Sequence, residues 1–438
     1  MRNPRILFRL WPLIALVITA CATHARLPAS AGFGPQPELP PPEQSALPTV
    51  NIAPAVGWSP GEQPLAAAGF SVAAFACGLD HPRSLHVLPN ADVLVAETDA
   101  PVRPGDRRGI RGLLMGAIMR RAGSGHPSAN RISLLRDGNH DGTAETRSVF
   151  IDGLDSPFGM ALVGDALFVA DTDALLRFGY QAGDIRIVQP GKKILDLPAG
   201  PINHHWTKNV VASADGRHLF VSIGSNSNVA ENGIANEADR ARVIEVELPS
   251  GHARPFATGL RNPVGMDWQP QSGKLWVAVN ERDELGGDLV PDYMTALADG
   301  AFYGWPYSYY GAHVDARVQP QRVDLVAHAT VPDYALGAHT ASLGLAFYTG
   351  TLFPAHYRGG VFVAQHGSWN RRPASGYKVI FVPFSNGHPD GMPEDILSGF
   401  LDAHGHARGR PVSVALDAAG ALLVADDVGG CVWRVTPR

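Results

Sequence analysis

Cysteine and charge are both scarce in this sequence. The only cysteines among 438 residues are Cys21, Cys77 and Cys431. So few cysteines exclude a scaffold held by several disulfides and a multi-cysteine zinc or iron–sulfur site. Charged residues make up 18% of the chain and leave a net charge of -5 at pH 7. This composition lacks the basic excess that nucleic-acid binding requires, so no nucleic-acid partner is expected.

What the sequence has instead is apolar residues and turn formers. Hydrophobic residues account for 45% of the chain, and there are 48 glycines and 36 prolines. The chain is too apolar to be disordered and too rich in turns to be a helical bundle. This composition predicts an all-β protein with many turns.

The first residues have the composition of a bacterial lipoprotein signal. Arg2, Arg5 and Arg9 precede an apolar run over 10–20, which ends in small residues before Cys21. We expect 1–20 to be a signal peptide and Cys21 to be the lipidated first residue of a membrane-attached, periplasmic protein. Ala22 lacks the charge that retains lipoproteins at the inner membrane, which favours the outer one. An uncleaved anchor helix is the alternative, although the run is shorter than the roughly 20 residues of a membrane span.

Two further segments follow the signal. Residues 21–64 contain ten prolines between positions 28 and 64, a composition that favours extended, unpacked chain, so we expect a tether. Residues 65–438 have a globular composition without another proline-rich break, and we expect one domain there.

A short strand pattern recurs six times in this domain. Most copies follow a hairpin turn such as Asp215-Gly216 and come some ten residues after a polar segment such as the one around Arg410 and Pro411. This repetition predicts a six-bladed β-propeller whose polar loops gather at one mouth. A sandwich with similar strands by coincidence is the alternative. The copies lie at 94–97, 168–171, 220–222, 276–278, 362–365 and 423–426.

Two loops have distinct local patterns. Asp137, Asn139 and Asp141 alternate before Gly142, as oxygen ligands do in calcium loops, although a plain Asp/Gly turn explains them equally well. Residues 103–131 form a basic, roughly amphipathic insertion that would suit an anionic membrane surface, an acidic partner or a solvated lid over the mouth.

A vicinal histidine pair precedes the third-blade strand. His205 suits a general base, and the nearby Lys208 would help to keep it neutral. The pair His204 and His205 could instead bind a metal, but no third ligand has a suitable spacing to it.

Three clusters suit a planar, polyanionic ligand at the mouth. Arg261 and Asn262 stand in a turn fixed by proline and glycine, where a guanidinium suits an anion or a developing oxyanion. Another cluster combines a flat aromatic ring with guanidiniums, and the last places two arginines on one side of an extended segment. The residues of these two clusters are His366, Trp369 and Arg371, and Arg408 and Arg410.

At these residues the sequence resembles the soluble glucose/sorbosone dehydrogenase family, which uses pyrroloquinoline quinone (PQQ). The resemblance covers about 70–438 and is greatest to the sorbosone dehydrogenase-like branch. It rests on the motifs around His205 (202–206), Arg261 (261–263), 280–285, 302–306, 365–370 and 408–410.

The resemblance implies an oxidoreductase with PQQ and calcium as cofactors, a sugar or sugar aldehyde as substrate, and a quinone or cytochrome as electron acceptor. It implies that His205 takes the proton from a sugar hydroxyl while hydride passes to the quinone, and that Arg261 stabilises the developing charge. The cofactor would be held by Asn262, His366, Trp369, Arg371, Arg408 and Arg410. The loop with Glu281 and Asp283 would hold calcium, largely through backbone oxygens.

Two other functions remain open at this point. A metal-dependent sugar lactonase would need acidic ligands converging on the channel, and the arginine-rich mouth argues against it. A non-catalytic binding propeller is kept open by Ser225 and His366, which stand where the family has an acidic residue and a lysine. Cys77 and Cys431 could bridge the terminal strands of a closing blade or remain free thiols.

Overall fold

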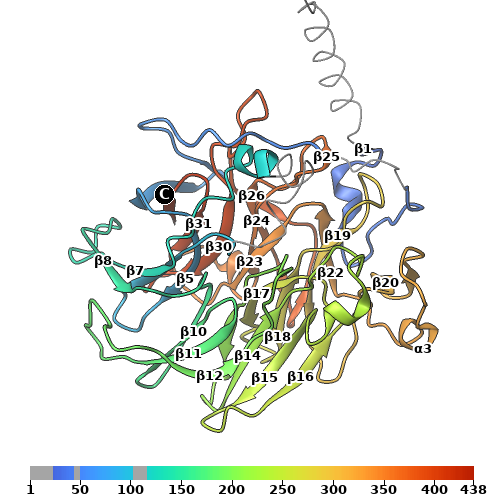
Figure 1. Cartoon of the computed structure of the whole chain (residues 1–438). Helices are drawn as coiled ribbons and strands as arrows, with labels where there is room; N and C mark the ends of the chain where they lie inside the picture. The colour runs from blue at the N-terminus through green and yellow to red at the C-terminus, as the bar shows by residue number, and fades with distance from the viewer. Residues whose placement is uncertain (1–22, 44–49, 102–115) are drawn as a thin grey trace, which may run out of the picture.

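Four-stranded sheets follow one another around a central axis (Figure 1). The computed structural model describes residues 23–43, 50–101 and 116–438. The predicted signal peptide, Cys21 and half of the basic insertion lie outside these ranges. Within them the fold is an all-β, six-bladed propeller, as the repeats predicted.

Each blade is an antiparallel sheet that begins with its innermost strand. Blade 1 has β5 (Pro82–Val87), β6 (Val93–Glu97), β7 (Arg131–Arg136) and β8 (Thr146–Ile151). Blade 2 has β9 (Gly159–Val163), β10 (Ala166–Ala170), β11 (Ala174–Gly179) and β12 (Lys192–Asp196). Blade 3 has β13 (Val210–Ala212), β14 (His218–Ile223), β15 (Arg242–Glu247) and β16 (Ala253–Thr258). Blade 4 has β17 (Pro263–Trp268), β18 (Leu275–Val279), β19 (Pro291–Ala296) and β22 (Tyr334–Ala338). Blade 5 has β23 (Ser342–Phe347), β24 (Val361–Gln365), β26 (Lys378–Val382) and β29 (Glu394–Ser398). Blade 6 has β30 (Pro411–Leu416), β31 (Leu422–Asp426), β32 (Cys431–Pro437) and β4 (Phe70–Cys77).

Short strands and helices lie in the loops outside the blades. The short strands are β1 (Thr23–His24) with β25 (Arg371–Arg372), β20 (Ser308–Tyr309) with β21 (His313–Val314), and β27 (Phe384–Ser385) with β28 (His388–Pro389). The short helices are η1 (Ala29–Gly32), η2 (Ile234–Glu237), α3 (Val323–Val326) and η3 (Ala355–Tyr357). None of the helices described is long and apolar enough to cross a membrane.

The recurring motif of the sequence is the second strand of every blade. These strands are apolar on both faces because each blade is covered by a neighbour on either side. In β18, Trp276 and Ala278 face the blade 5 side, whereas Leu275, Val277 and Val279 face blade 3. Similar apolar clusters fill the other junctions between adjacent blades. The hydrophobic core is thus a ring of interfaces.

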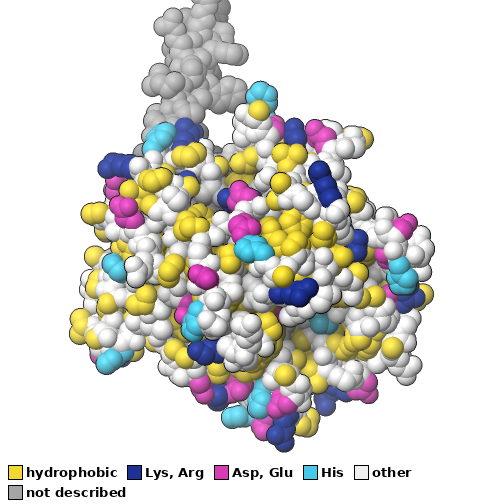
Figure 2. Space-filling model, turned by 180° about the vertical axis from the view of Figure 1, so that it is seen from behind, with side chains coloured by type: hydrophobic (Ala, Val, Ile, Leu, Met, Phe, Trp, Pro, Cys, Tyr) yellow, Lys and Arg dark blue, Asp and Glu magenta, His cyan; other side chains and the backbone are white. Residues whose placement is uncertain are grey.

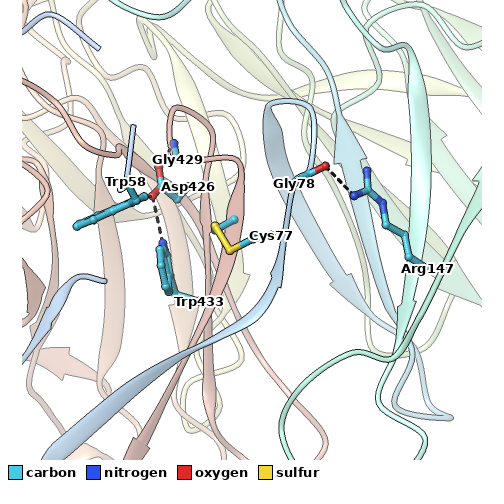
Figure 3. The surroundings of a disulfide bond; sticks show 8 residues. Trp58, Cys77, Gly78, Arg147, Asp426, Gly429 and Trp433 are labelled. Carbon is cyan, nitrogen blue, oxygen red and sulfur yellow. Dashed lines mark hydrogen bonds between the residues drawn. A yellow bond between two sulfur atoms is a disulfide. The ribbon is translucent and has the colours of Figure 1, made fainter. Parts of the chain in front are cut away.

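The ring closes within blade 6, where the N-terminal strand β4 pairs with the C-terminal strand β32. Cys77 lies opposite Cys431 in this pairing, and the two form a disulfide (Figure 3). Of the two alternatives for these cysteines, a bridge or two free thiols, the structure has the bridge. It joins residues that are 354 positions apart in the sequence.

The described part of the predicted tether contacts the propeller instead of standing free. β2 (Phe33–Gly34) extends blade 4 as a fifth strand, and directly after the tether β3 (Leu65–Ala66) extends blade 5. Ala53 is 5% exposed and belongs to the apolar cluster between blades 5 and 6. The prediction of an unpacked tether is wrong for these residues, because extended proline-rich chain can still add edge strands and bury small side chains.

The central channel holds a cavity of about 320 Å³, lined by the innermost strands of all six blades. Its lining residues span most of the length of these strands, from Ser84 and Val412 near the starts to Val87 and Leu416 at the ends. The loops that lead into these strands lie at one end of the channel, which we call the mouth. The molecule seen from behind shows side chains of both charges interspersed with apolar ones (Figure 2).

Candidate active site

Contacts between loops of different blades show that the loops converge at the mouth. Arg83 of blade 1 binds Asp427 of blade 6 at 2.5 Å and lies over the ring of Trp206 at 5.6 Å. Asn370, after β24, donates to Asp283, after β18, at 2.9 Å. The loops that the sequence repeats place before or after blade strands therefore form one site.

His205 is held in a defined tautomer. Its Nδ1 lies 2.9 Å from the backbone oxygen of Ser225 and 3.0 Å from the hydroxyl oxygen of the same residue. The carbonyl can only accept, so Nδ1 carries the proton and Nε2 presents its lone pair. Nε2 has no hydrogen-bond partner within the described chain, and a lone pair in this state suits a general base.

The electrostatic surroundings keep His205 neutral. Burial and the charge of Arg261 lower the pKa of the imidazole well below its usual range. Lys208, which the sequence suggested for this role, is fully buried and has a strongly lowered pKa of its own, owing to burial. Its ammonium group donates to the Trp206 carbonyl at 3.1 Å. The prediction about Lys208 is therefore wrong, and Arg261 takes its place.

Gly224 allows His205 and Asn262 to flank the same point. A Cβ atom on this glycine would lie 2.4 Å from the amide oxygen of Asn262 and 2.4 Å from Cβ of His205. A side chain at position 224 would thus displace both residues. Ser225, the next residue, stands where the resemblance implies an acidic side chain, and its backbone oxygen and hydroxyl group orient His205.

Arg261 lies among the loops that follow β14 and β18. Its guanidinium donates to the side-chain oxygens of Asn228 at 3.0 Å and Asn280 at 3.1 Å, and lies 3.6 Å from Asp283. Asn228 also accepts from the indole of Trp305 at 3.0 Å. Sequence analysis missed Asn228 because its partners are distant in sequence and its own loop has no motif.

Asp283 is held as a carboxylate by its neighbours. His339 and Asn370 bind its Oδ1 at 3.1 and 2.9 Å. Burial alone would raise the pKa of Asp283, but the His339 hydrogen bond and the Arg261 charge lower it to about 2. This carboxylate thus serves as a counter-charge to Arg261.

Glu281 is turned away from the metal role that the family resemblance implied. The Nε atom of Arg282 donates to its carboxylate at 2.9 Å. Arg282 is fully buried, is bound also by Asp315 at 3.2 Å and donates to the Ser308 carbonyl at 2.7 Å. A buried guanidinium needs such counter-charges. Both carboxylates predicted as calcium ligands are thus occupied by side-chain donors, and this loop does not fit a calcium ion held by them.

On the other side of the mouth, His366 pairs with Asp427. Its Nε2 lies 2.9 and 3.1 Å from the two carboxylate oxygens, one of which also binds Arg83. Burial would raise the pKa of Asp427, but the charges of His366 and Arg83 lower it. Burial also lowers the pKa of His366, and Asp427 opposes this shift. His366 is therefore an oriented imidazole where the family has a lysine.

The predicted arginines divide into two groups. Arg410 lies over the ring of Tyr377 at 5.0 Å, and Arg408 lies 3.5 Å from Glu62. Arg371, in contrast, donates to the carbonyls of Gly287 at 2.8 Å and Pro373 at 2.9 Å. The guanidinium of Arg371 thus fixes loops, and its contact with the cofactor stays a prediction. Trp369 is 36% exposed, so an aromatic face remains accessible.

Unpartnered polar atoms show that the mouth fits an anionic, hydrogen-bonding ligand. Within the described residues, the Nε atoms of Arg83 and Arg410 and the side-chain oxygen of Asn262 are buried without hydrogen-bond partners. Such orphaned groups are costly unless a ligand or water completes them. Two of the three are guanidinium donors, which suits a carboxylate-bearing molecule.

The calcium-like loop of the sequence lies apart from the mouth. Asp137, Asp141 and Glu145 place ligand atoms within 4.8 Å of one another in the turn between β7 and β8. The same side chains accept backbone hydrogen bonds in the turn, at 2.8 Å from Gly142 to Asp137 and from Gly138 to Glu145. The loop therefore has the geometry of a hydrogen-bonded turn.

Fold and site together define the class: a six-bladed β-propeller whose mouth has an oriented histidine and buried guanidinium groups. The chain is similar in sequence to two known protein families. Residues 170–368 match the family described as Glucose / Sorbosone dehydrogenase, and residues 320–438 match the one described as TrAA12-like. The family matches confirm the resemblance drawn from the motifs.

Individual relatives match over parts of their length. An uncharacterized protein of Borreliella burgdorferi is 30% identical over 247 residues, 55% of this chain and 62% of the relative. The aldose sugar dehydrogenase YliI of Escherichia coli is 24% identical over 171 residues, 36% of this chain and 44% of the relative. This chain thus covers less than two thirds of either protein.

Among solved structures, the holo form of the pyranose dehydrogenase PQQ domain from Coprinopsis cinerea has the same fold. It superposes with a TM-score of 0.67 and 21% sequence identity, over 88% of this chain and 100% of that chain.

Proposed function

We propose that this protein is a PQQ-dependent dehydrogenase that oxidises an aldose or a sugar aldehyde. One observation carries the proposal: His205 presents an unprotonated Nε2 beside Arg261 and Asn262, at the positions that the family motifs indicate. The same mouth has orphaned guanidinium donors for an anionic cofactor.

The residues of this chain divide the work as follows. His205 Nε2 accepts the proton of the sugar hydroxyl, and the Ser225 carbonyl stabilises the proton on Nδ1. Asp283 and Asn228 hold the guanidinium of Arg261 in place, where it would stabilise negative charge on a bound cofactor. Arg83, Arg408 and Arg410 would hold the carboxylates of the cofactor. When bound, PQQ supplies the carbonyl that accepts the hydride.

Electron transfer to a quinone or cytochrome and attachment to a membrane through Cys21 are parts of the proposal that rest on sequence. Calcium binding is part of it only through backbone oxygens of the loop, because the carboxylates of Glu281 and Asp283 are occupied by side-chain donors. The lactonase alternative is less favoured, because the cluster of acidic ligands found among the described residues lies in the Asp137 turn and not at the mouth.

The decisive experiment titrates the full chain with PQQ, with and without added calcium, and then measures dye reduction with a panel of aldoses. We expect saturable PQQ binding and sugar-dependent dye reduction. His205→Ala should bind PQQ but lose about 100-fold or more in rate, the share that general-base catalysis contributes. A chain that binds no PQQ under either condition contradicts the proposal.

A further inference from the structure

The segment 50–62, which we call the clasp, runs along the rim of the mouth. At its first end, the backbone N–H of Asn51 donates to the Trp369 carbonyl at 2.7 Å. The Asn51 side chain donates to the Arg371 carbonyl at 2.6 Å and accepts from Arg372 at 2.9 Å. One residue of the clasp thus fixes the loop after β24, which carries His366 and Trp369.

The middle of the clasp binds the loop that carries Arg408 and Arg410. Ala55 forms a parallel bridge with Ala407, with hydrogen bonds of 2.8 Å from the Ala407 N–H to the Pro54 carbonyl and from the Val56 N–H to the Ala407 carbonyl. The carbonyl of Ala53 accepts from the guanidinium of Arg410 at 3.4 Å. The clasp therefore joins the blade 5 loop to the blade 6 loop.

Trp58 connects the clasp to the backbone of Arg410 through Asp426. Its indole N–H donates to Oδ2 of Asp426 at 2.7 Å (Figure 3). The other oxygen of this carboxylate accepts from the backbone of Arg410 at 2.7 Å and from Gly429 at 2.8 Å. A Cβ atom at Gly409 or Gly429 would lie 2.2 Å from Asp426, so the carboxylate fits its loops without spare room.

We propose that the clasp positions the cofactor-binding loops, so that PQQ binding and docking of the clasp stabilise each other. Trp58 and Asn51 are the positioning residues, one for each loop. This inference rests on the proposed function, since it concerns the same mouth. Because coupling between two binding equilibria is reciprocal, PQQ must protect the clasp as much as the clasp favours PQQ.

The test measures PQQ affinity by titration calorimetry and backbone hydrogen exchange of the clasp in the full chain. Trp58→Phe keeps an aromatic ring and removes the donor to Asp426. We expect its dissociation constant for PQQ to rise about three- to ten-fold, the factor that one hydrogen bond contributes. Exchange at Ala55 and Val56 should be faster than in the wild type. Asn51→Ala should weaken PQQ binding similarly from the other end.

Trp433→Phe is the matched control. Trp433 also donates to Oδ2 of Asp426, at 3.1 Å, but it belongs to β32 (Figure 3). The Trp433→Phe variant should leave the hydrogen exchange of the clasp amides unchanged. If Trp58→Phe and Trp433→Phe weaken PQQ binding equally with unchanged clasp exchange, Asp426 alone matters and the inference is wrong.

Two further outcomes separate this inference from the proposed function. In the first, the wild-type chain binds PQQ without slower exchange in the clasp, and both clasp variants bind PQQ with unchanged affinity. This result contradicts the coupling between the clasp and PQQ and leaves the proposed function unaffected. Wild-type chain that binds no PQQ overturns the function and this inference with it.

Discussion

The imidazole of His366 and the carboxylate of Asp427 face each other at the mouth, with Nε2 2.9 Å from the nearer oxygen. The pair is mostly buried, and the same carboxylate binds Arg83. Asp427 of blade 6 thus binds Arg83 of blade 1 and His366 of blade 5. It therefore links the first and last blades electrostatically.

Asp427→Asn should therefore destabilise the protein strongly. Removing the charge leaves the guanidinium of Arg83 without its partner, and breaking a buried pair typically costs about 3–5 kcal/mol. The pKa of His366 should fall further, because Asp427 raises it in the wild type. Chemical denaturation measures the first effect and NMR titration the second. Asp395→Asn, which breaks the exposed pair with Lys378, should cost about 1 kcal/mol or less; equal losses would contradict the assignment.

The pKa of His205 can be measured without any cofactor. Burial and Arg261 lower it, so the imidazole should remain neutral at pH 7 and take up a proton only below pH 6.5. The unfolded chain binds that proton first, so the contribution to stability is complete above pH 6.5 and declines as the pH falls. Arg261→Gln should raise the pKa in an NMR titration. A pKa at or above 6.5 in the wild type would show that His205 is not held neutral.

Gly224→Ala should impair the site while the fold survives. The added methyl group would meet His205 and Asn262, and a displaced base loses the alignment that catalysis requires. We expect a loss of about ten-fold or more in kcat/KM together with a lower Tm, because overpacking at a close contact typically costs about 1–3 kcal/mol. Gly179→Ala is the control, because a Cβ atom there meets nothing within 4 Å. Full activity of Gly224→Ala would mean that His205 and Asn262 do not need this close approach.

The disulfide should contribute to stability in the oxidised protein. Loss of a native bridge typically costs about 2–5 kcal/mol, because the reduced unfolded chain gains conformations. The double variant Cys77→Ser/Cys431→Ser should unfold at lower denaturant concentration than the oxidised wild type. Reductant should have no further effect on the variant. Identical unfolding of both proteins under oxidising conditions would show that the bridge adds nothing.

The propeller could be predicted from sequence because its signal is local and repeated. Each second strand is apolar on both faces, so six similar runs survive the irregular loops between them. His205, Arg261 and Asn262 could be found because they lie in motifs beside such strands.

Other features depend on partners distant in the sequence. The family resemblance implied that Glu281 is a metal ligand. In the structure its carboxylate instead binds the neighbouring Arg282, which is fully buried and requires a counter-charge. Asp427 and Asn228 act through residues of other blades. The docking of residues 50–62 left no periodic pattern, because extended chain with small side chains contacts the rim mainly through its backbone.

The bridge between Cys77 and Cys431 also determines how the molecule would respond to a mechanical load. A pull applied to the two chain ends passes from one terminal strand to the other through the sulfur atoms, since these residues lie at the two ends of the ring. The blades between them carry no tension. Stretching would detach the clasp and the edge strands β2 and β3, and would then separate β4 from β32 from Phe70 and Pro437 onward; in the oxidised protein it would stop at the disulfide, which still joins the two strands.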